Sequence, residues 1–283
     1  MGRGGELHNL ATSRMGAKKT DALGNQEVTV RDSLMRPTRT EIYEASTLKY
    51  AEDRTFDAQG NLLTKTESSG TPLARTTTYA YNAGNQVTSI TVKSVVNPLQ
   101  SKVTAFEYDA KGNMVKRTET GLLGGGTPYF YVTAYTYTGS GQIASIDGPR
   151  TDAIDVTSFL YDAKGNLTKV TQPGGLVTTY SSYTQTGRPQ TVTDPNGVAT
   201  AYTYDPLDRV KTVTIAGDAT AYSYTPSGKI ASITLPKGNA VTYTYDSLDR
   251  LDQIKDAFGN SIDYAYDSAG NRTKEEIKDP LGA

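Results

Sequence analysis

The stretch Tyr243-Thr-Tyr-Asp-Ser-Leu-Asp-Arg250 is the most informative part of the sequence, because the chain repeats its pattern many times. The pattern returns as Tyr264-Ala-Tyr-Asp-Ser-Ala-Gly-Asn271 and, earlier in the chain, as Phe106-Glu-Tyr-Asp-Ala-Lys-Gly-Asn113. Each copy has an aromatic residue, a spacer, a tyrosine, an aspartate, two further residues and then Gly-Asn or a variant of that pair. A fixed period of roughly 20–50 residues is typical of a protein built from stacked copies of one small unit.

Ten copies align on the aromatic residue that precedes the turn. These anchors are Phe56, Tyr81, Tyr108, Tyr137, Tyr161, Tyr183, Tyr204, Tyr224, Tyr245 and Tyr266. The differences between consecutive anchor numbers are 25, 27, 29, 24, 22, 21, 20, 21 and 21, so the N-terminal half carries insertions. They lie near 92–104 and 120–131, and both are predicted to be longer hairpin loops because they are rich in Gly and Pro. Residues 1–19 match no repeat and are predicted to be a flexible arm. Residues 20–283 form the repeat region, which ends in the middle of a unit.

Each unit is predicted to be a β-hairpin. Tyr-x-Tyr alternation places both rings on one face of a strand. The aspartate can accept from the backbone N–H two residues on, and the glycine three residues later supplies the positive φ that closes the turn. After the turn, apolar pairs such as Val210 and Val213 are spaced by three, so a β-bulge between them would return both to one face.

The residues predicted to matter are structural: ring pairs that build a packed or inner face, and turn residues that close each hairpin. They are Phe56, Tyr81, Tyr108, Asp109, Gly112, Asn113, Tyr137, Tyr161, Asp162, Gly165, Asn166, Tyr202, Tyr204, Asp205, Tyr222, Tyr224, Gly228, Tyr243, Tyr245, Asp246, Tyr264, Tyr266, Asp267, Gly270 and Asn271. No catalytic, cofactor-binding or metal-binding residue is predicted. Turn aspartates and asparagines are expected from backbone chemistry alone, without calcium.

The predicted fold is all-β, with tandem units of about 21 residues forming antiparallel hairpins in one long sheet. About 20 strands at roughly 4.8 Å each would make a strip of about 95 Å. Twisted sheets of that length curl, so we expect a curled or spiralling sheet, a partial shell. A hydrophobic content of 36%, with 20 Tyr against 5 Phe, favours a thin architecture over a thick apolar core.

Composition excludes several functions. The absence of cysteine and the presence of one histidine, His8, argue against disulfides, thiolate metal sites and a Ser–His–Asp enzyme. A net charge of -1 gives no basic field for nucleic acid. No segment approaches ~18 consecutive apolar residues, so no membrane insertion is expected. The first residues lack the apolar stretch of a signal peptide.

With these motifs, the chain resembles the YD-repeat of the Rhs family, shared with toxin-complex C components and teneurins, over about residues 50–281. The resemblance implies a hollow β-shell that holds a toxin polypeptide, and an exported, extracellular or cell-surface location. This chain is far shorter than such a shell, and the family's C-terminal autoproteolytic region has no counterpart in it. The function expected is a non-enzymatic scaffold without cofactors, a segment of a shell that encapsulates a toxin or other polypeptide.

The alternative function is an extracellular recognition or adhesion module, which binds glycans or protein strands through its Tyr-rich face or an open sheet edge. The partners expected are a cargo polypeptide, the remainder of a longer chain, or a second copy that joins at an open edge.

Overall fold

The computed structural model describes residues 6–10, 14–94, 101–123 and 126–280. Within these residues there are 24 β-strands, no α-helix, and one 3-10 turn at Pro173–Gly175 (η2). The predicted all-β fold of antiparallel hairpins is therefore confirmed. The chain divides into two compact units, Met1–Val156 and Thr157–Ala283.

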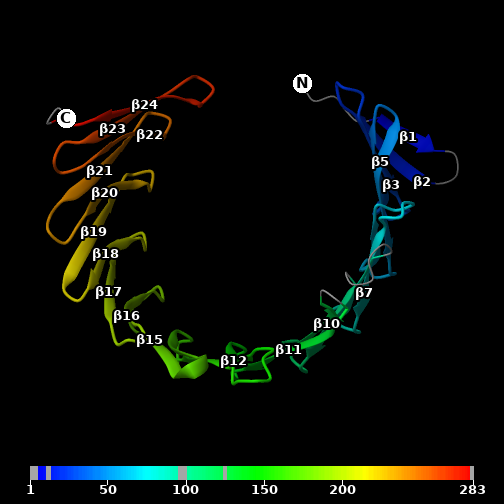
Figure 1. Cartoon of the computed structure of the whole chain (residues 1–283), viewed down its shortest axis with the longest axis horizontal. Coiled ribbons are helices and arrows are strands. Elements are labelled where there is room, and N and C mark those ends of the chain that lie inside the picture. Colours follow the sequence, from blue (N-terminus) through cyan, green and yellow to red (C-terminus); the bar gives the residue numbers. More distant parts are fainter. Residues whose placement is uncertain (1–5, 11–13, 95–100, 124–125, 281–283) are drawn as a thin grey trace. The chain divides into compact units, whose positions relative to one another are not determined.

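In the first unit, each strand pairs antiparallel with the next along the chain, as the blue to green half of Figure 1 shows. The strands are β1 (Glu6–Leu10), β2 (Arg14–Thr20), β3 (Gln26–Arg31), β4 (Pro37–Glu44), β5 (Thr47–Phe56), β6 (Leu62–Glu67), β7 (Arg75–Tyr81), β8 (Val87–Ser94), β9 (Lys102–Tyr108), β10 (Met114–Leu122), β11 (Pro128–Tyr137) and β12 (Ile143–Asp147).

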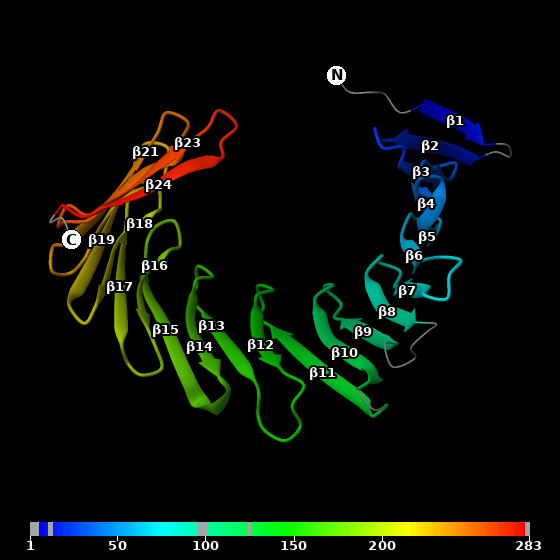
Figure 2. The ribbon, with the colours of Figure 1, turned by 45° about the horizontal axis from the view of Figure 1, so that its top comes forward.

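The second unit repeats this arrangement, and Figure 2 shows its strands side by side in chain order. The strands are β13 (Thr157–Tyr161), β14 (Leu167–Gln172), β15 (Leu176–Tyr183), β16 (Pro189–Thr193), β17 (Ala199–Tyr204), β18 (Val210–Ile215), β19 (Asp218–Tyr224), β20 (Ile230–Thr234), β21 (Ala240–Tyr245), β22 (Leu251–Lys255), β23 (Ser261–Tyr266) and β24 (Arg272–Lys278).

A β-bulge follows the anchor in nearly every hairpin. Between β17 and β18, Tyr202 pairs with Val213 and Tyr204 pairs with Val210, which leaves Lys211 as the extra residue. The same shift recurs in nine other hairpins. The pairing of β15 with β16 has no such shift. The bulge predicted from the spacing of three is thus present, and it puts Val210 and Val213 on the same face as the two rings. We call this face, in every repeat, the tyrosine face.

The opposite face carries small hydroxyl side chains. Thr203 and Thr212 lie across the strand pair with their Oγ1 atoms 2.6 Å apart. Equivalent hydroxyl pairs are Thr55–Thr64, Thr136–Ser145 and Ser223–Ser232. Cross-strand Thr and Ser pairs of this kind stabilise antiparallel sheets, and β-branched Thr also favours strand backbone. We call this the hydroxyl face.

Both faces of the sheet are largely in contact with solvent. Among the described residues, Ala51 and Val92 are the hydrophobic residues that are buried, and no large side chain is fully buried. The chain exposes 18489 Å² of surface, whereas a compact protein of its mass would expose about 11,800 Å². Each unit is therefore one layer of sheet without a second layer to close a core, which agrees with the low hydrophobic content.

Within the predicted flexible arm over 1–19, the described residues 6–10 and 14–19 lie in strands. The strand β2 pairs with both β1 and β3, so the sheet begins before residue 20. The turn Asp32-Ser-Leu-Met-Arg36 has the same form as the turn at 246–250, with Arg31 at the anchor position and the same bulge. This is an eleventh repeat, and an alignment on aromatic anchors misses it because its anchor is not aromatic.

The insertion near 120–131 lengthens two strands instead of forming a long loop. Gly121 of β10 pairs with Tyr129 of β11, and a Cβ on Gly121 would lie 2.8 Å from the Tyr129 ring. This ring stacks on Tyr131, with 4.9 Å between centroids. An aromatic ring that covers a glycine on a neighbouring strand replaces the packing that the glycine lacks. In the other insertion, near 92–104, residues 95–100 lie outside the described residues.

Candidate functional site: the tyrosine face and the row of turns

One edge of the sheet in each unit is a row of similar five-residue turns, one between each anchor and the next strand. We call it the turn row. In the turn at Asp109, the carboxylate Oδ1 accepts from the backbone N–H of Lys111 and of Asn113, at 2.9 Å each. Its Oδ2 accepts from Asn113 Nδ2, also at 2.9 Å. Gly112 has φ of 87°. Both carboxylate oxygens are therefore committed to closing the turn.

In three turns that begin with aspartate, arginine replaces asparagine as the last residue and makes the same contact. Arg209 Nε donates to Asp205 Oδ2 at 2.7 Å, and its guanidinium lies 4.3 Å from the ring centroid of Tyr224. The equivalent groups are Arg250 with Asp246 and Tyr266, and Arg36 with Asp32 and Phe56. The arginine thus closes its own turn and also holds the anchor ring of the next repeat by a cation–π contact.

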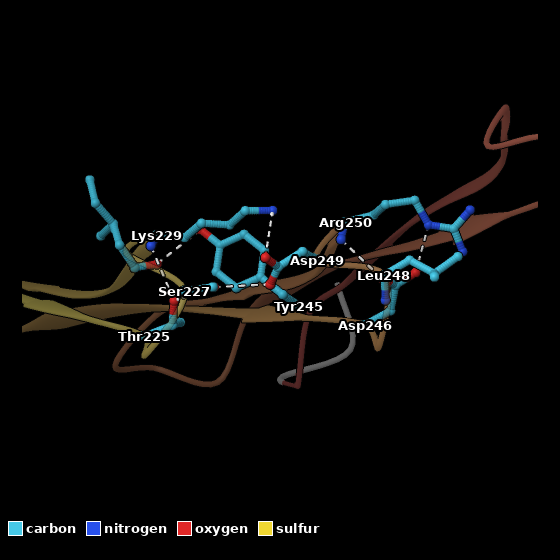
Figure 3. A network of polar contacts seen from close by, with 9 residues as sticks. Thr225, Ser227, Lys229, Tyr245, Asp246, Leu248, Asp249 and Arg250 are labelled. Atoms are coloured by element: carbon cyan, nitrogen blue, oxygen red, sulfur yellow. Dashed lines mark hydrogen bonds and ion pairs between the residues drawn. The ribbon is translucent and has the colours of Figure 1, made fainter.

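Neighbouring turns of the row are joined by polar side chains, as Figure 3 shows for the turns at 225–229 and 246–250. Ser227 Oγ donates to Asp249 Oδ1 at 3.0 Å, and Lys229 Nζ lies 4.0 Å from Asp249 Oδ2. Lys229 also lies over the Tyr245 ring, 4.9 Å from its centroid. Asp249 stands where most turns have glycine, with φ of 64°. Its carboxylate therefore contributes a contact between repeats at a position where glycine has none.

The anchor tyrosines carry the main link between repeats. The Tyr204 hydroxyl donates to the backbone carbonyl of Pro189, with 2.7 Å between the two oxygens. Pro189 is the first residue after the preceding turn. The same bond joins Tyr81 to Leu62, Tyr108 to Val87, Tyr137 to Met114, Tyr183 to Leu167, Tyr224 to Val210, Tyr245 to Ile230 and Tyr266 to Leu251. Burial raises the pKa of the Tyr204 hydroxyl, so it remains a neutral donor. This ladder of hydroxyls explains why nine of the ten anchors are Tyr, with Phe56 as the exception.

The second ring of each pair also lies on the tyrosine face. Tyr202 is opposite Val213, and the equivalent pairs are Tyr222–Ile233, Tyr243–Ile254 and Tyr264–Glu275. The anchors Phe56 and Tyr161 take the same place relative to their turns, paired with Leu62 and Leu167. The structure therefore places the predicted ring pairs together on one face and the predicted turn residues along one edge.

The tyrosine face is interrupted by charge in the first unit. On β5, Glu52 is 6% exposed and pairs with Arg54 and with Lys65, whose Nζ lies 3.3 Å away. The Tyr50 hydroxyl donates to the same carboxylate at 2.9 Å. In most other repeats the position of Arg54 holds Tyr or Phe and that of Lys65 holds Val or Ile, so an alignment on the aromatic anchors gives no signal for the cluster.

The described residues show hollows but no metal centre. In the second unit a hollow of about 760 Å³ lies between the turns at 162–166 and 184–188. In the first unit a hollow of about 550 Å³ lies beside Arg36, Arg39 and Asp53. No group of three His, Cys, Asp or Glu among the described residues could hold a metal ion. Over the same residues, no helix has the length and hydropathy needed to cross a membrane.

Because of the aspartates in the turn row, we expect acid to destabilise the sheet. The hydrogen bond from Asn113, with those from the backbone, holds the pKa of Asp109 below its ordinary value of 3.8. The same cause lowers the pKa of Asp21, Asp57, Asp162, Asp256 and Asp267. A carboxyl with a lower pKa in the folded state stabilises that state above the unfolded pKa, and the contribution is lost as pH falls through the folded pKa. We expect the urea midpoint to hold from about pH 7 to pH 5 and to fall below about pH 4.

A matched variant tests the cause of this acid sensitivity. In Asp109→Asn the side chain cannot ionise, so the urea midpoint should start lower at neutral pH and lose less on acidification. A midpoint of the unmodified protein that stays level down to pH 2 would contradict the prediction.

Comparisons with known proteins agree with this geometry. Residues 161–199, 183–221 and 224–259 match the family model RHS Repeat, all within the second unit. The fold is similar to the crystal structure of TcdB2-TccC3, with a TM-score of 0.63 and 16% identity over 95% of this chain and 18% of that chain. It is also similar to TcdB2-TccC3-Cdc42, with a TM-score of 0.54 and 15% identity over 95% of this chain and 18% of that one. At these identities the likeness is one of fold.

The chain spans less than one fifth of the length of those structures. No curated protein sequence matches it.

Proposed function

Because the chain is an RHS-repeat protein of the YD type, we propose that it forms part of a structural β-shell that encapsulates a polypeptide cargo, such as a toxin. Proteins with this repeat are generally structural. The observation that carries the proposal is the ladder of anchor hydroxyls, which joins each repeat to the one before it. Such nearest-neighbour bonds extend a wall by one unit at a time, as in other repeat proteins.

The single layer supports an enclosing role. The tyrosine face presents rings and aliphatic side chains that are only half-buried, as at Tyr202, Tyr222 and Ile233. A second layer would normally cover such a face. In a shell, the cargo or another turn of the same wall supplies that cover, so the sheet needs no core of its own.

We assign the protein no catalytic step. The repeated carboxylates, which are its most regular chemical feature, are already occupied by backbone N–H groups in the turns. Their role in the proposal is to close hairpins, and the role of the aromatic residues is to connect them.

The partners in this proposal are proteins: a cargo polypeptide, the remainder of a longer chain, or a second copy. Among the described strands, β1 and β24 each pair with one neighbour, so strand addition can occur there. Five of the seven residues of β24 are charged, which disfavours indiscriminate pairing at that edge. We further propose export to the cell surface or exterior, because Rhs-type proteins typically act there.

The test uses a photo-crosslinking residue on each face of the same strand. The protein is produced together with the polypeptide encoded next to it, with the crosslinker at Tyr222 or at Ser223, which lie on opposite faces of β19. Encapsulation predicts crosslinks from one face only, together with protection of the neighbour from added protease. Equal crosslinking from both faces, or a neighbour that is digested as fast as when alone, would refute it.

A recognition module is the second candidate, and the lengthened hairpin of β10 and β11 favours it. Phe130 is 65% exposed and Tyr131 is 43% exposed, beside the stacked ring of Tyr129. Exposed aromatic residues of this kind are enriched at protein interfaces. If this hairpin is the binding surface, Phe130→Ser should abolish binding to a surface glycan or protein while leaving cargo protection unchanged.

A further inference from the structure

The strand ends opposite the turn row carry a regular set of exposed apolar side chains. We call this edge, in each unit, the far rim. Ten of its connections each hold, in the loop or at the adjoining strand end, one large hydrophobic residue that is between 43% and 85% exposed. These residues are Leu23, Leu48, Leu73, Leu123 and Ile154 in the first unit, and Leu176, Val198, Ile215, Leu235 and Phe258 in the second. One further connection includes 95–100, outside the described residues.

The turn row does not share this pattern. Of its eleven described turns, three carry an exposed large hydrophobic residue. In the second unit its six turns contain eleven charged residues, whereas the five far-rim connections contain three, Asp194, Lys237 and Asp256. The two aspartates accept backbone N–H bonds within their own turns. The far rim is therefore apolar and poor in free charge, as the core of a protein interface is.

Turn geometry does not require these apolar residues. In the far-rim turn at 256–260, the N–H of Phe258 donates to Asp256 Oδ1 at 2.9 Å, and in the turn row Lys111 makes the same bond to Asp109 Oδ1. The two turns have the same form, so lysine serves as well as phenylalanine. A single exposed apolar side chain is ordinary, but one at the same place in repeat after repeat marks a surface that is covered in the working protein.

The spacing of these side chains selects the kind of partner. Successive far-rim connections are two strands apart, which is roughly 9.6 Å at about 4.8 Å per strand. An α-helix returns an apolar residue every ~5.4 Å and a β-strand every ~6.8 Å, so neither stays in step with five such positions. A second sheet of the same repeat has the same spacing along its whole length.

We propose that the far rim binds the far rim of a second copy of this chain, which gives a dimer with two-fold symmetry. Each rim then presents the same surface, and the apolar side chains of one fit between those of the other. The low charge of the rim matters here, because a contact between identical surfaces brings like charges together. This contact is distinct from strand addition at β1 or β24, and it holds with or without an enclosed cargo.

The area of the rim is enough for a stable dimer. A rim is one sheet layer wide, about 10 Å, and five connections span about 48 Å, which gives roughly 480 Å² per protomer in each unit. The two units together supply about 960 Å² per protomer, or about 1,900 Å² in total, within the range of stable interfaces. One unit alone falls below that range, so the stripes of both units are needed.

The experiment is sedimentation equilibrium of the full chain at concentrations from about 1 to about 100 µM. We expect a monomer–dimer equilibrium with a Kd on the order of 10 µM or tighter. The double variant Leu235→Lys, Phe258→Lys places charge on the far rim of the second unit and should weaken the dimer at least tenfold. Leu23→Lys with Leu73→Lys tests the first unit independently, with the same expected loss. All four side chains are exposed, so both variants should fold, which thermal melting checks.

The matched control is Leu207→Lys with Leu248→Lys, because these leucines are each 70% exposed in turns of the turn row. Its Kd should stay within twofold of that of the unmodified protein. The proposal is overturned if the unmodified chain stays monomeric at about 100 µM, or if the control weakens the dimer as much as the far-rim variants do. Association that continues beyond the dimer and survives the far-rim variants would also overturn it, since the contact then lies at the edges of β1 and β24.

Discussion

Gly141→Val is expected to lower the free energy of unfolding locally by about 1–3 kcal/mol, because Gly141 has φ of 85° and a β-branched residue is strained there. No heavy atom lies within 4 Å of the Cβ that would be added, so the cost is conformational and not steric. Gly165 and Gly270 have φ of 86° and 91°, and valine at either position should have the same effect.

The sharpest control for this prediction lies in the same turn. Gly139 also has open space around its added Cβ, but its φ is not in the left-handed region. Gly139→Val should therefore leave the turn intact. The readout is amide hydrogen exchange at Thr138, whose N–H donates to the Gln142 carbonyl at 2.8 Å. Protection should fall roughly 5- to 150-fold in Gly141→Val. Equal protection in the two variants would contradict the assigned turn.

Tyr204→Ala is expected to cost about 2–3 kcal/mol, from the ring burial that is lost and from the hydroxyl bond to Pro189. Because each repeat contacts only its neighbours, the loss should concentrate in β16, β17 and β18. Hydrogen exchange across the second unit measures this. A uniform loss of protection over β13 to β24 would instead show that the unit unfolds in one step.

Two conservative changes separate the ring from its hydroxyl. Tyr204→Phe keeps the ring and should cost about 1 kcal/mol, the typical net value of one hydrogen bond. Phe56→Tyr is the reverse change, since Phe56 is the anchor without a hydroxyl and the corresponding carbonyl belongs to Pro37. It should gain about 1 kcal/mol by adding the missing bond to the ladder. A destabilised Phe56→Tyr would mean that the first repeats are connected differently.

The sequence predicts the hairpins well because their causes are local. The alternation of Tyr202 and Tyr204 places both rings on one face of the strand. The Asp205 carboxylate closes its turn by accepting hydrogen bonds from two backbone N–H groups of that turn. The spacing of three between Val210 and Val213 indicates the bulge. Each of these requirements acts within a few residues, so it can be read without knowing what lies next to the repeat.

The contacts between repeats could not be predicted from such local patterns. The acceptor of each tyrosine hydroxyl is a backbone carbonyl, which every residue has, so sequence has no signal for it. The eleventh repeat was missed for a related reason: Arg31 stands at its anchor position, and only the pairing of β3 with β4 identifies it.

An all-β repeat, the places of its turns and the residues that share a face thus follow from the sequence alone. How one repeat joins the next, how the insertion near 120–131 lengthens two strands, and where Ser182 lies beside a hollow became visible only in the folded chain. The difference lies in how far along the chain each interaction reaches. Backbone preferences and side-chain alternation act along the chain, whereas the hydroxyl ladder, the arginine contacts and the hollow depend on residues about 14–24 positions apart that only the pairing of strands brings together.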